Sequence, residues 1–320
     1  MATMRAALYD SYGGPDVLYE GTLPIPEVGD DDVLVRVAAT TVNGGELLMR
    51  SGRLKLITGS KFPLPLGIDF VGTATKIGSK VSNVAVGDPV WGMVEERRGL
   101  GANAEYAIAT SNHLASAPTN LTPVEAAGLL VGGTTALTGL RDKTNLQSGE
   151  RLLVRGAAGG VGTMAVQLGK HLGAHVTALA KEEQIEALRD LGADDVLDYR
   201  TTKPDQVGKY DVIFDTKGTQ LPAFRRQLRP GGRMVAIAFD ITRLVSSLGY
   251  IGLSSIHGSG RVRFFRGKPT RPLFEQLTRL AETSALRPVV DSTYRLDQIS
   301  SAHAALEAGG MFGKAVIDLS

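Results

Sequence analysis

The strongest constraint on the fold is the stretch at residues 151–162, RLLVRGAAGGVG, together with the apolar pattern that follows it. Residues 152–155 are rich in branched apolar side chains, which is typical of a buried strand. Apolar residues then recur at helical spacing from Val161 to Leu172, and Gly173 is placed to end the helix. A strand that turns into a helix through glycines leaves free backbone N–H groups at the positive end of the helix, where they favour an anion.

The turn carries a version of the dinucleotide fingerprint. Ala157, Gly159 and Gly162 give A-x-G-x-x-G, in which the first position needs only to be small. Gly159 lets the backbone approach a pyrophosphate, and Gly162 lets the helix pack against the strand. Gly160 and Val161 complete the predicted cofactor-binding turn. A tight turn without a ligand is the alternative, because the chain contains 39 glycines.

The surrounding pattern favours nucleotide binding over an empty turn. Apolar strands are predicted at residues 175–180, 196–199 and 210–215, with a short amphipathic helix between the first two. Strands that alternate with helices in this order specify a parallel, doubly wound sheet. The sequence therefore predicts a Rossmann-type domain.

Length and composition narrow the remaining possibilities. The chain has 320 residues, of which 43% are hydrophobic, so about two domains with sizeable cores are expected. A net charge of +2 argues against nucleic acid or a membrane surface as the main partner. The chain contains no cysteine, which excludes disulfides and thiolate zinc sites. With no long apolar segment and no signal-like N-terminus, we expect a soluble, cytoplasmic protein.

The N-terminal third has a different character. Glycine and proline recur between short apolar runs, which indicates a β-rich, barrel-like domain. At Thr122-Pro123-Val124-Glu125 the pattern changes to a capped helix start, so the domain change is expected near residue 122. Strand-like residues 313–319 at the end of the chain are expected to complete the first domain.

Several motifs in one order resemble a known family. They include PLGIDFVGTATKIGSKV, VGDPVWG, GAAGGVG, YDVIFDTKG, LRPGGRMV and FGKAVIDL. The whole chain resembles the zinc-independent quinone oxidoreductase branch of the medium-chain dehydrogenase/reductase superfamily. The resemblance implies an α/β fold, with a GroES-like β-rich catalytic domain at 1–122 and 286–320 and a Rossmann NADP-binding domain at 123–285. It also implies catalysis in the cleft between them.

The resemblance also bears on metal binding. The places of the catalytic zinc ligands of related alcohol dehydrogenases fall at Asn43, Ile68 and approximately Val131. None of these offers a thiolate or an imidazole. The five histidines are scattered without metal-ligand spacing and are expected to be surface or packed residues. The sequence therefore predicts no metal site.

The cofactor is expected to be NADP(H). An acidic residue about 20 positions after the fingerprint accepts the ribose 2′-hydroxyl in NAD-preferring domains, but that position falls near Lys181, a cation that suits a 2′-phosphate. By resemblance, Tyr199 lines the adenosine phosphate pocket. Glu182 and Glu183 keep NADH open, and Lys181 as a solvated loop charge is the further alternative.

Further cofactor contacts are expected where strands end and in the terminal motif. Gly218 follows one predicted strand and Ala238–Phe239 follow the next, at the carboxyl ends where ligands bind in open α/β sheets. By resemblance, Gly313 and Lys314 belong to a motif that closes over the cofactor.

Without zinc, the expected reaction is reduction of a quinone or an α,β-unsaturated carbonyl. The substrate oxygen gains negative charge and needs a hydrogen-bond donor. By resemblance, Asn43 is the candidate donor and Thr135 packs near the nicotinamide; a turn asparagine and a helix-cap hydroxyl are the alternatives. The family usually shows N-P-x-D where this chain has Asn43-Gly44-Gly45-Glu46. No strong general acid is visible, so water is expected to protonate the enolate.

Other functions remain open. One is an NADPH-binding protein with little turnover, acting in regulation or on RNA, for which a basic cluster at Arg261, Arg263, Arg266, Lys268 and Arg271 is the only sign. Another is a reductase that tailors a natural product. Residues 261–265 alternate like an edge strand, so a homodimer through the Rossmann edge is expected.

Overall fold

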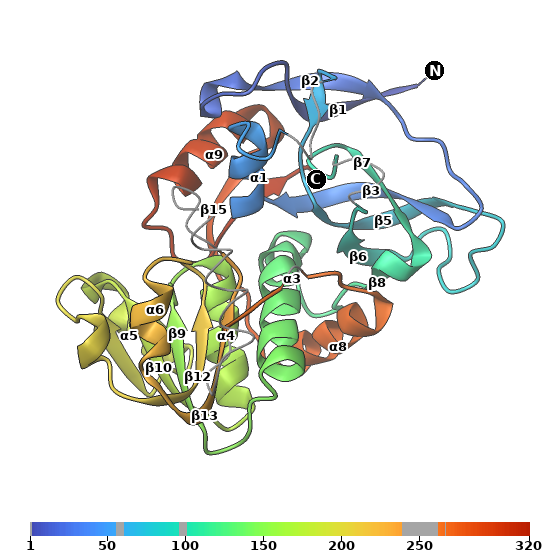
Figure 1. Ribbon diagram of the computed structural model, residues 1–320. Helices are drawn as coiled ribbons and strands as arrows, with labels where there is room; N and C mark the ends of the chain where they lie inside the picture. The colour runs from blue at the N-terminus through green and yellow to red at the C-terminus, as the bar shows by residue number, and fades with distance from the viewer. Residues whose placement is uncertain (1, 56–60, 96–100, 239–261, 266) are drawn as a thin grey trace. The chain divides into compact units, whose positions relative to one another are not determined.

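The computed structural model describes residues 2–55, 61–95, 101–238, 262–265 and 267–320 (Figure 1). The chain forms two compact units: one contains Met1–Val131, Pro269–Ser284 and Pro288–Ser320, and the other contains Gly132–Lys268 and Ala285–Arg287. The sequence had assigned residues 269–284 to the Rossmann domain. The domain boundaries predicted at residues 122 and 286 remain predictions. Phe239, Arg261 and Arg266 lie outside the described residues.

The second unit is built on a six-stranded sheet with the order β11-β10-β9-β12-β13-β14. Every neighbouring pair in this sheet is parallel. Its strands are β9 (Arg151–Arg155), β10 (His175–Ala180), β11 (Asp195–Asp198), β12 (Tyr210–Asp215), β13 (Leu228–Ala236) and β14 (Val262–Phe264). The chain leaves from the centre of the sheet toward one edge and then returns to build the other half, so the predicted Rossmann fold is confirmed.

Helices cover this sheet because its strands are apolar on both faces. α4 (Gly160–His171) packs on β9 and β10, while α5 (Ile185–Asp190) packs on β11 and α6 (Leu221–Arg225) on β13. Leu153, Ile213 and Met234 from three strands lie fully buried in one core cluster. Continuous apolar strands of this kind are expected in a parallel sheet that is covered on both sides.

The first unit is β-rich, as the sequence predicts. A seven-stranded sheet has the order β15-β16-β3-β5-β6-β8, with β7 also paired to β3, and a smaller sheet has the order β2-β1-β4. The strands are β1 (Thr3–Tyr9), β2 (Leu18–Pro24), β3 (Asp32–Thr41), β4 (Leu64–Pro65), β5 (Asp69–Ile77), β6 (Pro89–Met93), β7 (Tyr106–Thr110), β8 (Leu114–Ser116), β15 (Val290–Arg295) and β16 (Lys314–Asp318). The described helices of this unit are α1 (Gly44–Arg50), α8 (Arg271–Glu282) and α9 (Ile299–Ala308), together with the first part of α3 (Pro123–Leu137).

The start of α3 and the last strand of the chain both agree with the predictions from sequence. Thr122 and Glu125 form the predicted capping box of α3: the Glu125 carboxylate accepts from the Thr122 N–H at 2.8 Å, and the Glu125 N–H donates to the Thr122 hydroxyl at 3.3 Å. The terminal strand β16 pairs antiparallel with β3, so the chain end completes the first unit as expected. No described helix is long and apolar enough to cross a membrane.

Candidate functional site

The glycine turn, residues 156–162, joins β9 to α4 in the second unit. Gly159 is exposed and serves as the N-cap of α4, and the first turn of the helix carries no acidic side chain. Since the first backbone N–H groups of a helix have no intrahelical partner, this end of α4 is suited to an anion.

Two glycines of the turn, Gly162 and Gly159, differ in how much room the structure leaves for a side chain. A Cβ on Gly162 would lie 2.2 Å from the Gly156 carbonyl oxygen and 2.7 Å from Ala157, so close packing of the helix on the turn requires it. A Cβ on Gly159 would approach only the Gly156 oxygen, at 3.7 Å, which is ordinary contact. Nothing in the described protein fills the space beside Gly159, and a ligand backbone or phosphate can approach there.

A buried ion pair holds the neighbouring turn after β12. The Arg155 guanidinium pairs with the Asp215 carboxylate, stacks over the Phe224 ring at 3.6 Å, and donates to the Thr219 carbonyl at 2.8 Å. Asp215 also accepts the backbone N–H groups of Lys217 and Gly218, at 2.7 and 2.9 Å. The predicted contact residue Gly218 is therefore fixed at the carboxyl end of the sheet. Ala238, partly buried, follows β13, while Phe239 lies outside the described residues.

The ends of β10 and β11 bring the predicted adenosine-side residues together. Lys181 directly follows β10, and Tyr199, which is 49% exposed, follows β11 with its N–H bonded to the Ala180 carbonyl at 3.1 Å. Arg200 pairs with Glu183 at 3.0 Å and with Asp198 at 2.8 Å, and those hydrogen bonds raise its pKa further. Glu182 lies 3.8 Å from the same guanidinium. Both glutamates of the NADH alternative are thus paired with an arginine.

Asn43 lies in the first unit at the junction of β3 and α1. Its backbone N–H donates to the Glu46 carboxyl at 3.2 Å, and its carbonyl accepts the Glu46 N–H at 2.9 Å. Glu46 therefore caps the helix at its N-terminal end, where a carboxyl group is favoured. The sequence offered this signal, since asparagine followed three residues later by glutamate is a capping pattern.

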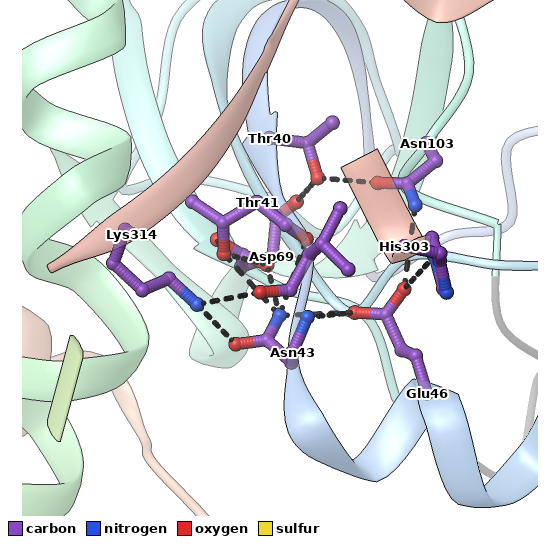
Figure 2. Close-up of polar contacts among 9 residues, drawn as sticks. Thr40, Thr41, Asn43, Glu46, Asp69, Asn103, His303 and Lys314 are labelled. Carbon is purple, nitrogen blue, oxygen red and sulfur yellow. Dashed lines mark hydrogen bonds and ion pairs between the residues drawn. The ribbon is translucent and has the colours of Figure 1, made fainter. Parts of the chain in front are cut away.

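Figure 2 shows a buried set of polar side chains around Asn43, which we call the Asn43 network. It contains Thr40, Thr41, Asn43, Glu46, Asp69, Asn103 and Lys314, and each of them is buried. The Asn43 amide nitrogen lies 3.0 Å from a carboxyl oxygen of Glu46 and 3.0 Å from one of Asp69, and 3.2 Å from both oxygens of Thr41. Four acceptors thus surround two amide hydrogens. To accept one of these hydrogens, a substrate oxygen would have to displace one of the four acceptors.

Burial disfavours the ionised forms of the two carboxyl groups in the Asn43 network, Glu46 and Asp69. Burial raises the pKa of Glu46 to about 8, with nearby Asp69 adding to the shift and the Asn43 amide opposing it. Burial also raises the pKa of Asp69, while Lys314 and the hydrogen bonds from Thr41 and Asn43 oppose that shift. Thr41 donates its hydroxyl to the two Asp69 oxygens, at 3.0 and 2.8 Å. Asn103 donates to Glu46 at 3.3 Å.

Lys314 supplies the cation of this network. Its ammonium donates to the Asn43 side-chain oxygen at 2.6 Å and to the Val42 carbonyl at 3.0 Å. Burial lowers the Lys314 pKa, and the nearby Asp69 and Glu46 oppose that shift. The structure therefore brings two of the predicted site residues, Asn43 and Lys314, into direct contact. Gly313, buried beside the Val289 carbonyl, comes directly before Lys314.

Two further buried side chains adjoin the network, Arg50 from α1 and His303 from α9. The Arg50 and His303 side chains are fully buried, and Arg50 pairs with Glu307 at 2.8 Å. Both ring nitrogens of His303 lack a hydrogen-bond partner among the described residues, although Nε2 lies 4.0 Å from Glu46. Burial, together with the Arg50 charge, lowers the pKa of His303 to about 3. His303 is thus packed and neutral.

Thr135 lies on α3, in the second unit, and is partly buried. The positions that correspond to zinc ligands hold Asn43 before α1, Ile68 before β5 and Val131 on α3. In the described part of the chain, no group of three or more His, Cys, Asp or Glu residues could hold a metal ion.

Comparison with known proteins places the two units in context. The family model described as "Alcohol dehydrogenase GroES-like domain" matches residues 29–119, and the one described as "Zinc-binding dehydrogenase" matches residues 191–317. The chain is 33% identical to an NADPH-dependent alkenal/one oxidoreductase of Arabidopsis thaliana, over 98% of this chain and 79% of that protein. It is 30% identical to a quinone-oxidoreductase homolog of Spinacia oleracea, over 98% of both chains.

A solved structure extends the likeness to three dimensions. The quinone oxidoreductase from Coxiella burnetii superposes with a TM-score of 0.91 at 26% identity and covers 100% of both chains. With the matched GroES-like model, this confirms the predicted pairing of a GroES-like domain with a Rossmann fold.

Proposed function

Because this chain belongs to the medium-chain dehydrogenase/reductase superfamily, in its quinone-oxidoreductase-like branch, we propose that it reduces quinones or α,β-unsaturated carbonyls with NADPH and without zinc. Membership makes it an oxidoreductase with a nicotinamide cofactor. The substrate class, the phosphate preference and the independence from metal are parts of the proposal.

The observation that carries the proposal is the open space beside Gly159. The glycine turn offers the first N–H groups of α4 at its positive end, and no described side chain comes within 4 Å of a Cβ placed on Gly159. The turn therefore fits a dinucleotide, which when bound supplies a hydride. Of the described residues in this unit, Ala157, Gly160, Val161 and Gly162 would form the turn around the phosphates, with Gly218 and Ala238 at the strand ends.

NADPH is favoured by the charges after β10. A 2′-phosphate at this end of the sheet would meet Lys181 and the Tyr199 ring. Glu182 and Glu183, which would otherwise suit a ribose 2′-hydroxyl, face Arg200. The alkenal/one oxidoreductase relative carries NADPH in its name.

On the substrate side, the proposed roles fall to Asn43 and Thr135. Reduction of an enone adds a hydride to the β-carbon and a proton to the α-carbon, and negative charge develops on the carbonyl oxygen between the two steps. An amide hydrogen of Asn43 would stabilise that oxygen, while Thr135 would pack beside the nicotinamide. Lys314, which we predicted to contact the cofactor, acts in this proposal by holding the Asn43 side-chain oxygen at 2.6 Å.

The test is NADPH consumption by the purified protein with a panel of small quinones and enones, with NADH alongside. We expect turnover with NADPH and less with NADH. The variant Asn43→Ala should lower kcat while leaving the Kd for NADPH unchanged. An unchanged kcat would remove Asn43 from the mechanism, and tight NADPH binding without turnover would favour the non-catalytic alternative.

The Rossmann edge is the proposed dimer contact. β14 is the last strand of the described six-stranded sheet, and Phe264 on it is 36% exposed. The alternating pattern of residues 261–265, which the sequence predicts as an edge strand, supports pairing with a second copy. Sedimentation at micromolar concentration should give a dimer, and a clean monomer would contradict this proposal.

A further inference from the structure

The Asn43 network holds more acceptors than its central amide can serve. Two amide hydrogens of Asn43 face oxygens of Thr41, Glu46 and Asp69 at 3.0–3.2 Å. The two carboxyl contacts are the shortest of these, at 3.0 Å each. Whether an amide hydrogen can turn to a substrate oxygen therefore depends on how strongly each carboxyl group holds it.

The charges around Glu46 do not balance. Its carboxyl group, on a residue 1% exposed, shares Asn43 with Asp69 of β5, and the Lys314 ammonium of β16 is the network's cation. On the α1–α9 side lie the packed ring of His303 and the Arg50 guanidinium, which is already paired with Glu307. Two buried carboxylates beside one ammonium leave an excess negative charge, and binding one proton removes it.

Glu46 is the group that takes this proton. Asp69 receives hydrogen bonds from the Thr41 hydroxyl and from Asn43, and such bonds stabilise its ionised form. Glu46 accepts from the side-chain amide and the backbone N–H of Asn43, at 3.0 and 3.2 Å, and from Asn103 at 3.3 Å, so none of its donors is a hydroxyl group or a cation. The burial that raises the pKa of Glu46 to about 8 acts in the same direction.

We propose that Glu46 is a positioning residue whose protonation controls Asn43: the neutral carboxyl releases an amide hydrogen to the substrate oxygen, and the carboxylate withholds it. A hydrogen bond to an ionised acceptor is roughly twice as strong as one to a neutral acceptor. A carboxylate at this place also repels the charge that develops on the substrate oxygen. Both effects lower turnover when Glu46 ionises. The proton stays on Glu46 during the reaction and is not transferred to the substrate.

This inference rests on the proposed function, since it concerns the same reaction. With a Glu46 pKa of about 8, the neutral fraction falls about tenfold between pH 7 and pH 9, and kcat should fall by the same factor. The KM for NADPH should not follow that profile, because Glu46 belongs to the Asn43 network and not to the glycine turn that is proposed to hold the dinucleotide.

The decisive variant is Glu46→Gln, which keeps the shape and the helix-capping oxygen but cannot ionise. The ratio of kcat at pH 7 to kcat at pH 9 should drop from about tenfold to below about twofold. Glu307→Gln is the matched control, because Glu307 is a half-exposed glutamate of the same unit that pairs with Arg50 rather than with Asn43. It should retain the tenfold ratio.

A second measurement needs no cofactor or substrate. Infrared difference spectra of the cofactor-free protein between neutral and alkaline pH should show loss of a protonated carboxylic acid in the wild type and not in Glu46→Gln. Absence of that signal in the wild type, or an alkaline fall of kcat that persists in Glu46→Gln, would overturn the inference but not the proposed function. Absence of turnover with every acceptor at neutral pH would overturn the proposed function and the inference with it.

Discussion

The glycine turn of the second unit and the Asn43 network of the first unit are built in opposite ways. The glycine turn offers backbone N–H groups to a ligand, and its specific residues lie within seven consecutive positions, 156–162. The Asn43 network consists of side chains, with charged members from α1, β5 and β16. A backbone site needs space and small residues, whereas a buried charged site needs every group to keep its partner. The two should therefore fail in different ways when they are mutated.

The largest effect is expected where the Asn43 network loses its cation. Lys314→Met removes the ammonium from beside Asp69 and Glu46 and leaves buried carboxyl groups uncompensated. Leaving a buried charge uncompensated costs about 3–5 kcal/mol. Chemical denaturation at neutral pH measures the loss, and Lys314→Arg, which keeps the charge, should lose less. A loss below about 1 kcal/mol would mean that the network does not depend on this charge.

The next effect concerns the neutral His303 beside the network. Its pKa is lowered from 6.5 to about 3 in the folded protein. The folded state therefore binds fewer protons than the unfolded state within that window, so the stability contributed by the neutral ring is present above pH 6.5 and is lost as the pH falls toward 3.

Between pH 7 and pH 5 this linkage amounts to about 2 kcal/mol. His303→Leu keeps a side chain of similar size at this buried position and cannot take up a proton. Urea denaturation at both pH values should therefore show a smaller loss for the variant by that amount. Equal losses would show that His303 is protonated in the folded protein.

Gly162→Ala and Gly159→Ala separate folding from binding within the glycine turn. The new methyl group at Gly162 would meet the Gly156 oxygen at 2.2 Å, and such overpacking costs about 1–3 kcal/mol of stability. At Gly159 the nearest atom is 3.7 Å away, so the free energy of unfolding should fall by no more than about 1 kcal/mol, the cost of alanine at the N-cap. Binding of NADPH to Gly159→Ala, followed by fluorescence titration, should nevertheless weaken about tenfold, because the methyl group occupies the path of the pyrophosphate. Unchanged NADPH affinity would contradict the placement of the phosphates.

The smallest expected effect is that of Lys181→Ala. Removing this cation should weaken NADPH binding about fivefold and leave NADH binding unchanged, since only NADPH carries the 2′-phosphate. Calorimetric titration with both cofactors measures the difference. Lys170→Ala, at an exposed lysine of α4 that pairs with Asp194, is the control. Equal weakening of both cofactors by Lys181→Ala would remove the residue from phosphate recognition.

The same contrast explains what could be predicted from sequence. The Rossmann sheet and its glycine turn depend on local patterns, namely an apolar strand, small residues and a helix period, and they were predicted correctly. Thr122 and Glu125 were likewise recognisable as a cap, because both partners lie within one turn of the helix. Sequence motifs also pointed to Asn43 and Lys314, which lie 271 positions apart.

The relation between those residues could not be predicted. The capping pattern links Glu46 to Asn43, but Asn103 and His303 had no signal as neighbours of Glu46, because burial and the spacing between elements are set by tertiary packing. Asp69 follows Ile68, one of the positions that correspond to zinc ligands, and nothing in the local sequence marks it as a partner of Asn43. Its role as the second acceptor for Asn43 depends on the pairing of β3 with β5. Contacts between residues close in sequence can thus be predicted from the sequence, whereas the contacts of a buried charge network can be identified only from the folded structure.

The central claim is reduction by NADPH without zinc, and it is tested most directly by turnover after metal removal. The purified protein is treated with a chelator, its zinc content is measured by atomic spectroscopy, and NADPH consumption is followed with an enone and a quinone. We expect turnover to persist in protein without zinc and to be unaffected by added Zn²⁺. Loss of turnover on chelation, with recovery when Zn²⁺ is returned, would contradict the account.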